Sequence, residues 1–362
     1  MRILYVLEHY YPHIGGVEKL FQGLAEALAK EGHNVTVVTT RHRKGLPELQ
    51  RLNGVKVIRL RVKDRFGFTL LGIPAIVRLA QRADLIHTTS YNAAVPAYIA
   101  ARLRKKKIII TFHEVWGPLW NKLPFIEWWQ RQAYSAFERF ILRFRFDKVI
   151  AVSDYTAKCL KDVGTDPQKI STIYNGIDYQ LFDKIHHSPP SSHFAFTYYG
   201  RLGISKGLDM IIPAFASLTT LHRNIRLKLI IPRQPENLLH EINTMIKRYG
   251  IAEFIEILHE LNKERLFREV SHSSCVLLPS YSEGFCFVAA ECAAMSVPVI
   301  SSGRGSLSEV VGGPYIEMPA LNVLQLQKAM IAAIEGKWAQ RPLRSFSLDN
   351  TIRKYIELYR QL

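Results

Sequence analysis

The segment between residues 275 and 300 constrains the fold more than any other part of the chain. Residues 275–278 are apolar and end at Pro279, and residues 297–300 form a second apolar run. The residues between them, 287–295, are small, apolar and rich in alanine, which favours a short buried helix. The loop 283–286 therefore leads into a helix N-terminus, where free backbone amides can bind a phosphate or the oxygens of a sugar.

Two glutamates stand out in this otherwise apolar segment. Glu283 lies in the loop, and Glu291 follows eight positions later, about two helical turns deeper. A surface glutamate and a buried glutamate paired with a basic neighbour would give the same pattern without any catalytic role. The flanking strands and the Gly284-Phe285 loop favour a binding site instead.

The rest of the chain alternates between apolar strands and amphipathic helices, which predicts two α/β domains with parallel sheets. We expect one domain over residues 1–182, a linker over 183–193, a second domain over 194–345 and a final helix within 346–362. Single helices are predicted at 17–30 and 68–81 in the first domain, and strands are predicted at 2–7, 35–39, 55–60, 83–87, 108–112, 148–153, 196–199, 227–231 and 275–278.

Glycines and charged residues stand at the carboxyl ends of several predicted strands, where open α/β sheets bind ligands. Gly15 and Gly16 follow the first strand, and His113 closes the strand at 108–112. A bare Gly-Gly is more often a turn, and a lone histidine is more often structural. Arg201 and Lys206 lie in a glycine-containing loop after a strand, and a guanidinium with an ammonium suits a diphosphate. The residue order of a P-loop is absent.

Taken together, these motifs resemble those of the retaining, nucleotide-sugar-dependent glycosyltransferases of GT-B fold, family four (glycosyl transferases group 1). The resemblance covers nearly the whole chain, although Cys286 stands where glycine is usual and Glu114 stands where aspartate is common. The matching segments are His9-Tyr-Tyr-Pro with Gly15-Gly16-x-Glu18, Thr111-Phe112-His113, Gly200-Arg201-Leu202 with Lys206-Gly207, and Pro279-Ser280 with Glu283-Gly284-Phe285, Glu291 and Pro298-Val299-Ile300.

The resemblance implies a fold and a reaction. Two Rossmann-like domains would face a central cleft, and the C-terminal helix would cross back to the first domain. A hexose-type sugar would move, with retention of configuration, from a nucleoside-diphosphate sugar to an acceptor held by the first domain. The acceptor is expected to be anionic or lipid-linked, such as a membrane-associated glycan or glycolipid.

The resemblance also implies roles for particular residues. His113 would orient the sugar or the acceptor, and Glu283 would contact the sugar hydroxyls and stabilise an oxocarbenium-like transition state. Glu291 would accept hydrogen bonds from the ribose. The full set of implied donor-binding residues is Gly15, Gly16, Arg201, Lys206, Gly284, Phe285, Cys286, Phe287, Val288 and Glu291. Because the chain has no Asp-x-Asp triplet to hold a divalent ion, we expect no metal and no other cofactor.

The chain is strongly basic, and the charge is unevenly distributed. The formal net charge is +17, and residues 1–180 hold 28 Lys and Arg against 15 Asp and Glu. Such a field favours an anionic partner, such as acidic lipids, a phosphorylated acceptor or nucleic acid. Between Trp116 and Phe146, aromatic residues alternate with arginines at helical spacing, which fits an element lying on a membrane surface. A core helix with arginines on its solvent side is the alternative.

No apolar run is long enough to span a bilayer, the start lacks a signal-peptide pattern, and the four cysteines show no metal spacing. We therefore expect a cytoplasmic enzyme, peripheral on the cytoplasmic face of the membrane, that binds acidic lipids through its basic first domain. Two alternatives remain: a nucleotide-sugar epimerase of the same architecture, and a basic membrane- or nucleic-acid-binding protein. Nucleic acid is not expected, since the basic run 102–107 lacks stacking aromatic residues nearby.

Overall fold

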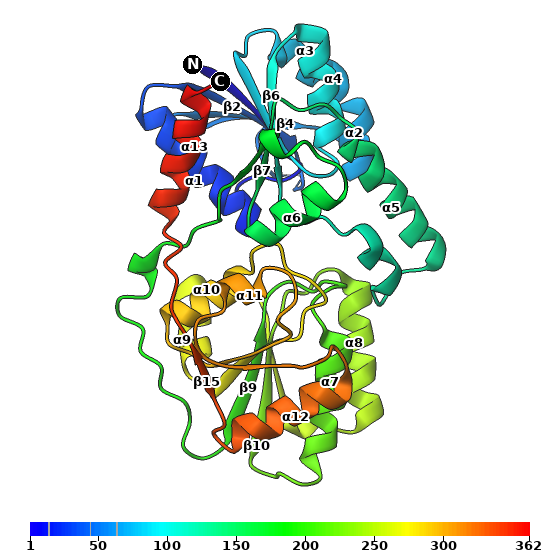
Figure 1. The fold of residues 1–362 in the computed structure, drawn as a ribbon, viewed down its shortest axis with the longest axis vertical. Helices are drawn as coiled ribbons and strands as arrows, with labels where there is room; N and C mark the ends of the chain where they lie inside the picture. The colour runs from blue at the N-terminus through cyan, green and yellow to red at the C-terminus, as the bar shows by residue number, and fades with distance from the viewer. Residues whose placement is uncertain (14, 44, 63) are drawn as a thin grey trace. The chain divides into compact units, whose positions relative to one another are not determined.

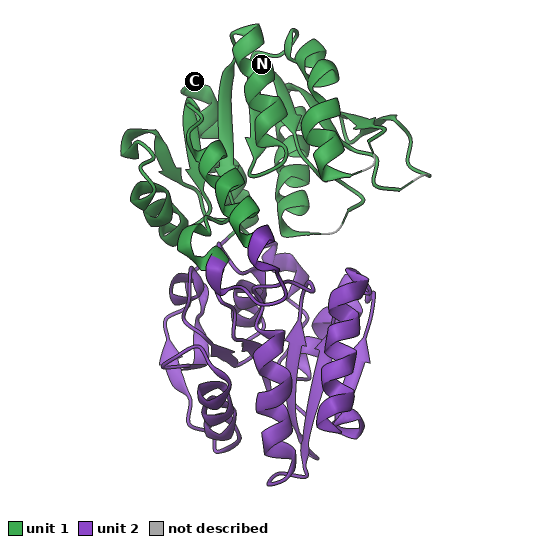
Figure 2. Ribbon diagram, turned by 90° about the vertical axis from the view of Figure 1, so that its right-hand side faces the viewer, with its two compact units in different colours: residues 1–120, 131–176, 347–362 green, residues 121–130, 177–346 purple. Residues whose placement is uncertain are grey.

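The structure is a computed structural model that describes residues 1–13, 15–43, 45–62 and 64–362. The chain forms two compact α/β units (Figures 1 and 2). Unit 1 consists of residues 1–120, 131–176 and 347–362, and unit 2 consists of residues 121–130 and 177–346. Neither unit is therefore a single continuous stretch of the sequence.

Unit 1 is built on an eight-stranded sheet with the order β3-β4-β2-β1-β5-β6-β7-β8. The strands pair in parallel except for β3, which runs antiparallel to β4 through a turn at Asn53-Gly54 where both residues have positive φ. The strands are β1 (Arg2–Val6), β2 (Asn34–Thr40), β3 (Leu49–Leu52), β4 (Val55–Leu60), β5 (Leu85–Thr89), β6 (Lys107–Phe112), β7 (Lys148–Ala151) and β8 (Ile170–Thr172).

Helices cover both faces of this sheet because successive strand residues point to opposite sides. In β1, Leu4 and Val6 contribute to the core on one side, and Ile3 and Tyr5 contribute to the core on the other. The first side is covered by α2 (Arg65–Leu71), α3 (Ile73–Ala80), α4 (Ala94–Arg104), α5 (Trp128–Leu142) and α6 (Asp154–Asp162), and the second by α1 (Gly16–Lys30) and α13 (Leu348–Arg360).

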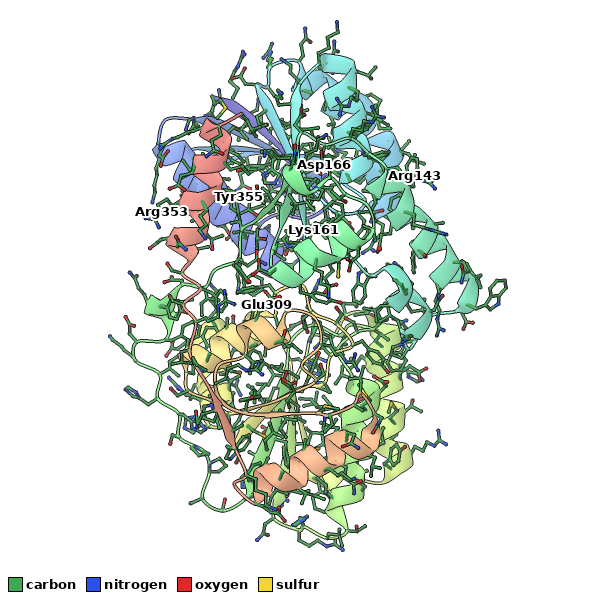
Figure 3. The ribbon with its side chains drawn as sticks, viewed as in Figure 1. Arg143, Lys161, Asp166, Glu309, Arg353 and Tyr355 are labelled. Atoms are coloured by element: carbon green, nitrogen blue, oxygen red, sulfur yellow. The ribbon has the colours of Figure 1, made fainter. Side chains whose placement is uncertain are left out.

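The helix α13 follows unit 2 in the chain but packs beside α1 in unit 1 (Figure 1). Figure 3 shows Tyr355 lying toward the body of the unit and Arg353 lying on its outer side. Tyr355 and Tyr359 are fully buried, and the Tyr359 hydroxyl lies 3.0 Å from the hydroxyl of Tyr5 on β1. Residues 347–362 thus complete the core of unit 1.

The single helix predicted at 68–81 is wrong. The structure has two helices there, α2 and α3, which meet at Gly72. Pro74 lies in the first turn of α3 and has no N–H to donate to a preceding helical carbonyl, so the α2 hydrogen-bond ladder cannot continue through it.

Unit 2 has a seven-stranded sheet with the order β11-β10-β9-β12-β13-β14-β15, and only β15 pairs in the antiparallel sense. One face of the sheet packs against α7, α8 and α12, while α9 and α10 contact side chains of the opposite face. The elements are β9 (Phe194–Tyr199), α7 (Leu208–Thr219), β10 (Ile225–Ile230), α8 (Glu236–Tyr249), β11 (Ile255–Leu258), α9 (Lys263–Ser271), β12 (Cys275–Leu278), α10 (Phe287–Ala294), β13 (Val299–Ser301), α11 (Leu307–Val310), β14 (Gly313–Glu317), α12 (Val323–Ile334) and β15 (Ala339–Arg341).

Residues 121–130 begin within the short 3-10 helix η1 (Gly117–Lys122) and pack with unit 2. There Phe125 and Ile126 line a small pocket together with Leu238 of α8. Among the described residues, none of the helices is both long enough and apolar enough to cross a bilayer.

Candidate active site

Three loops of unit 2 meet at one edge of its sheet. They follow β9, β12 and β13, which are neighbouring parallel strands, so their carboxyl ends lie side by side. Backbone hydrogen bonds join the loops: the N–H of Tyr281 donates to the carbonyl of Ser205 at 2.8 Å, and the N–H of Ser306 donates to the carbonyl of Glu283 at 2.9 Å. The motifs that are far apart in the sequence are therefore joined in the fold.

A buried ion pair lies at the centre of these loops. The ammonium of Lys206 is 2.9 and 2.8 Å from the two carboxylate oxygens of Glu283, and the hydroxyl of Ser280 donates to Oε1 of Glu283 at 2.7 Å. Glu283 is only 5% exposed. A carboxylate can be buried to this extent because a cation and a hydroxyl donor replace its lost hydration.

Two glycines allow the loops to approach this closely. Gly207 has a φ of +75°, and a Cβ there would lie 2.2 Å from the carbonyl oxygen of Pro279. Gly305 has a φ of +66°, and a Cβ there would lie 2.4 Å from the carbonyl oxygen of Glu283. Any side chain at either position would push against the backbone of the loop that carries Glu283.

The loop after β12 leads into α10. Gly284 and Phe285 are buried, and Phe287 and Val288 are half-buried in the first turn of the helix. Cys286 caps the helix with a φ of +62°, in the left-handed region that glycine adopts without strain. Burial raises the pKa of the Cys286 thiol well above its usual value, so the side chain is neutral and is not poised as a nucleophile.

The two remaining predicted residues of unit 2 are Glu291 and Arg201, which lie outside the ion pair. The hydroxyl of Tyr199, at the end of β9, donates to Oε2 of Glu291 at 3.0 Å. Burial raises the pKa of Tyr199 well above its usual range, so this hydroxyl stays protonated and can donate. Arg201 follows two residues later and is exposed, while its carbonyl accepts a hydrogen bond from Tyr198 at 2.9 Å. Its guanidinium is thus at the loop surface, where an anion can reach it.

His113 belongs to unit 1, where it directly follows β6. It is half-buried, and its ring centre lies 6.5 Å from that of Phe21. Behind it, the fully buried His87 is hydrogen-bonded through Nε2 to the Thr111 hydroxyl at 2.8 Å and through Nδ1 to Tyr359. Burial, with a smaller contribution from the charge of His113, lowers the pKa of His87 to about 3, so His87 is neutral.

Gly15 and Gly16 begin α1 in unit 1. A Cβ at Gly15 would lie 2.1 Å from the Glu18 carboxylate, which is also 3.2 Å from Nδ1 of His13. The space beside Gly15 therefore holds an acidic side chain. The predicted donor contact of these glycines stays a prediction.

Glu138 is a polar residue that the sequence interpretation missed. It lies on α5, is 1% exposed, and its carboxylate accepts hydrogen bonds from unit 1. Three of the donors follow β6: the amides of Trp116 and Gly117 and the indole of Trp120. The sequence held one signal, since Glu138 is the only acidic residue between positions 128 and 146.

The structure thus brings together the predicted residues of unit 2 at one sheet edge, with Lys206 and Glu283 in direct contact. The predicted residues His113, Gly15 and Gly16 stand in unit 1. Sequence interpretation also missed Tyr199, whose only signal in the sequence is a hydroxyl at the end of a largely apolar strand.

The chain matches two protein families over adjacent ranges. Residues 14–181 match Glycosyltransferase Family 4, and residues 182–340 match Glycosyl transferases group 1. A similar curated protein is an uncharacterized glycosyltransferase of Methanocaldococcus jannaschii, 24% identical over 86% of this chain and 83% of that protein. Another, from Arabidopsis thaliana, is one of the subunits of phosphatidylinositol N-acetylglucosaminyltransferase, 24% identical over 86% of this chain and 69% of that protein.

Solved structures share the fold. Sucrose-phosphate synthase from Thermosynechococcus elongatus superposes with a TM-score of 0.82 at 20% identity, covering 100% of this chain and 99% of that chain. HepE of Anabaena, in complex with UDP and glucose, has a TM-score of 0.76 at 18% identity and covers 100% of both chains. With the two family matches and the two Rossmann-like units, this chain belongs to the family-four glycosyltransferases of GT-B fold.

Proposed function

We propose that the enzyme transfers a hexose-type sugar, with retention of configuration, from a nucleoside-diphosphate sugar to a lipid-linked or membrane-associated glycan or glycolipid. Unit 2 binds the donor and unit 1 binds the acceptor. Two similar proteins support the substrate classes: HepE was solved with UDP and glucose, and the Arabidopsis relative is named for phosphatidylinositol.

The observation that carries the proposal is the contact of Lys206 with Glu283 at the edge where three loops meet. Departure of a nucleoside diphosphate places negative charge on the leaving group, and fixed positive groups lower the barrier by stabilising that charge. Lys206, the guanidinium of Arg201 and the first amides of α10 supply such groups. Glu283, held in one orientation by Lys206 and Ser280, faces the developing positive charge of the sugar.

Donor binding is tested first by thermal shift with UDP-, GDP- and ADP-sugars, since a bound donor raises the apparent melting temperature. Transfer is then measured with an acceptor panel of polyprenyl phosphate, polyprenyl-diphosphate-linked N-acetylglucosamine, diacylglycerol and phosphatidylinositol. The anomeric configuration of the product, read by NMR, tests retention. Donor conversion to an epimer without an acceptor would instead favour the nucleotide-sugar epimerase.

Lys206→Met and Glu283→Gln should each lower turnover by about a hundredfold or more, because each removes a group that stabilises the transition state. Lys228→Met is the matched control, since Lys228 forms a similar part-buried pair with Glu269 at 2.5 Å. That pair lies between β10 and α9, away from the three loops. Equal loss of activity in all three variants would contradict the assigned roles.

We further propose that transfer needs no metal ion. In support, the sequence has no Asp-x-Asp triplet, and no group of three or more His, Cys, Asp or Glu side chains within the described ranges is arranged to hold an ion. Turnover should be unchanged after dialysis against EDTA. Loss of turnover that Mg²⁺ or Mn²⁺ restores would refute this.

We propose that the enzyme is cytoplasmic and docks on acidic membrane through the α2–α5 side of unit 1. Apolar side chains are exposed there, including Leu70 and Leu71 at 65% and 74%; the others are Phe66, Leu103 and Phe140. These four helices hold six arginines and one acidic residue, and that residue, Glu138, is buried. Exposed apolar groups among cations suit a bilayer with anionic headgroups.

The sequence interpretation placed the whole run from Trp116 to Phe146 on the membrane. In the structure, part of this run faces inward. The amide of Trp116 and the indole of Trp120 donate to Glu138, and the side chains of Ile141 and Phe146 are buried. Flotation with phosphatidylglycerol vesicles tests the docking side: Leu70→Ser with Leu71→Ser should abolish binding at low salt. Leu221→Ser with Leu343→Ser in unit 2, at 73% and 65% exposure, should leave binding intact. Equal effects of the two pairs would contradict the assignment.

A further inference from the structure

One buried carboxylate in unit 1 holds two loops at the carboxyl edge of the sheet. Oε1 of Glu138 accepts from the amide of Gly117 at 2.7 Å, and Oε2 accepts from the amide of Trp116 at 3.1 Å and the indole Nε1 of Trp120 at 2.9 Å. The Tyr91 hydroxyl, from the loop after β5, lies 3.1 Å from Oε2 and 3.0 Å from the carbonyl of Glu114, and can donate to either.

All of these donors are neutral. A carboxylate that is 1% exposed is costly to bury unless several hydrogen bonds replace its hydration, and these four donors do so. The hydrogen bonds from the loop after β6 stabilise the buried carboxylate, and the carboxylate in turn holds this loop in one conformation.

The position of this loop matters because it begins at His113. It also carries part of an aromatic row, which consists of Trp116, Trp120 and Tyr134 with successive ring centres 5.6 and 5.3 Å apart. The two tryptophans are half-buried and Tyr134 is exposed, so the row reaches the surface. Glu138 itself is too buried to touch a substrate.

We propose that Glu138 is a positioning residue that holds residues 113–120 in the conformation that receives the acceptor. This inference rests on the proposed function, in which unit 1 binds the acceptor. Without the carboxylate, the amides of Trp116 and Gly117 lose their acceptor, so the loop opens and both His113 and the aromatic row move. The cost falls on acceptor binding, since Lys206, Arg201 and the first amides of α10, to which we assign the donor diphosphate, belong to unit 2.

Glu138→Gln tests this with almost no change of shape. Its amide has one acceptor oxygen and turns an NH₂ group toward other donors, so the set of hydrogen bonds cannot be kept. We expect faster hydrogen–deuterium exchange at the amides of Trp116 and Gly117, and a shifted indole N–H resonance of Trp120. With polyprenyl-diphosphate-linked N-acetylglucosamine as the acceptor probe, KM should rise about tenfold or more, with donor KM changed less than twofold.

Two further variants keep the test decisive if Glu138→Gln unfolds. Trp120→Phe keeps a ring but removes one donor, so it should raise acceptor KM by a few-fold and have little further effect in the Glu138→Gln background. Glu357→Gln, an exposed residue of α13, is the control and should change neither exchange nor KM. Wild-type protein that uses no acceptor of the panel would contradict the proposed function. Active wild type with unchanged exchange and unchanged acceptor KM in Glu138→Gln would overturn the positioning role.

Discussion

Gly305→Ala is the change that most directly tests how the three loops of unit 2 support Glu283. Gly305 has a φ of +66°, and a Cβ there would lie 2.4 Å from the carbonyl oxygen and 2.5 Å from the nitrogen of Glu283. Real Cβ atoms do not approach backbone this closely, so either the loop after β13 or the backbone of Glu283 must move. The three atoms nearest to the new methyl group all belong to the backbone of Glu283.

Two penalties add in this variant. Placing alanine in the left-handed region costs about 1–2 kcal/mol, and forcing a methyl group into a packed site costs a further 1–3 kcal/mol or so. We therefore expect Gly305→Ala to lower the free energy of unfolding by about 2–5 kcal/mol. The surviving folded protein should turn over about a hundredfold more slowly, since a displacement of about 1 Å at a reacting group has an effect of that order.

Two other glycines serve as controls, because alanine there has the cost of the positive φ without the cost of a steric clash. Gly250 and Gly336 have φ of +64° and +72°, and a Cβ at either would meet nothing within 4 Å. Gly250→Ala and Gly336→Ala should therefore lose only about 1–2 kcal/mol in urea unfolding and keep full turnover. The reasoning is refuted if Gly305→Ala matches these two variants in both stability and turnover.

Three further predictions concern single side chains. Tyr199→Phe removes the hydroxyl that donates to Glu291, so donor KM in a steady-state assay should rise about tenfold while kcat changes little; an unchanged donor KM would contradict a role for this pair. Cys286→Gly should raise the free energy of unfolding in urea by about 1 kcal/mol by relieving the positive φ, and Cys286→Ala, which keeps the strain, should give no gain. His87 has a pKa of about 3 in the folded protein and about 6.5 in the unfolded chain, so below pH 6.5 unfolding takes up a proton and the free energy of unfolding falls. Between pH 7.5 and 5.5 the free energy of unfolding should fall by about 1.4 kcal/mol more in the wild type than in His87→Gln. Equal losses in the two proteins would show that His87 is not the cause.

Most of the central strands could be located from the sequence, because they are continuous apolar runs. The order of the strands in each sheet was not predicted, and the edge strands were missed. Residues 339–341, Ala-Gln-Arg, form β15 only because they pair with β14, and nothing in their composition favours a strand. The break at Gly72 was missed because the apolar spacing of α2 continues into α3, so periodicity alone indicates one helix.

The predicted site residues were recognised as motifs, each at the end of its own strand, whereas their contacts are a property of the fold. Lys206 and Glu283 are 77 positions apart, and no local pattern indicates that they form an ion pair. Glu138 shows the opposite problem. Its neighbours on α5 are aromatic and basic, which favoured a surface interpretation, and only the folded loop shows that a carboxylate is needed inside.

The discontinuous path of the chain has a consequence for biosynthesis. When residue 346 has left the ribosome, every residue of unit 2 is available, whereas the sheet of unit 1 still lacks Tyr355 and Tyr359 against one face. The half that is translated first is therefore the half that finishes folding last. Until α13 arrives, the apolar surface around Tyr5 is open to chaperones and to aggregation, and a protein cut before residue 347 would keep that surface exposed permanently.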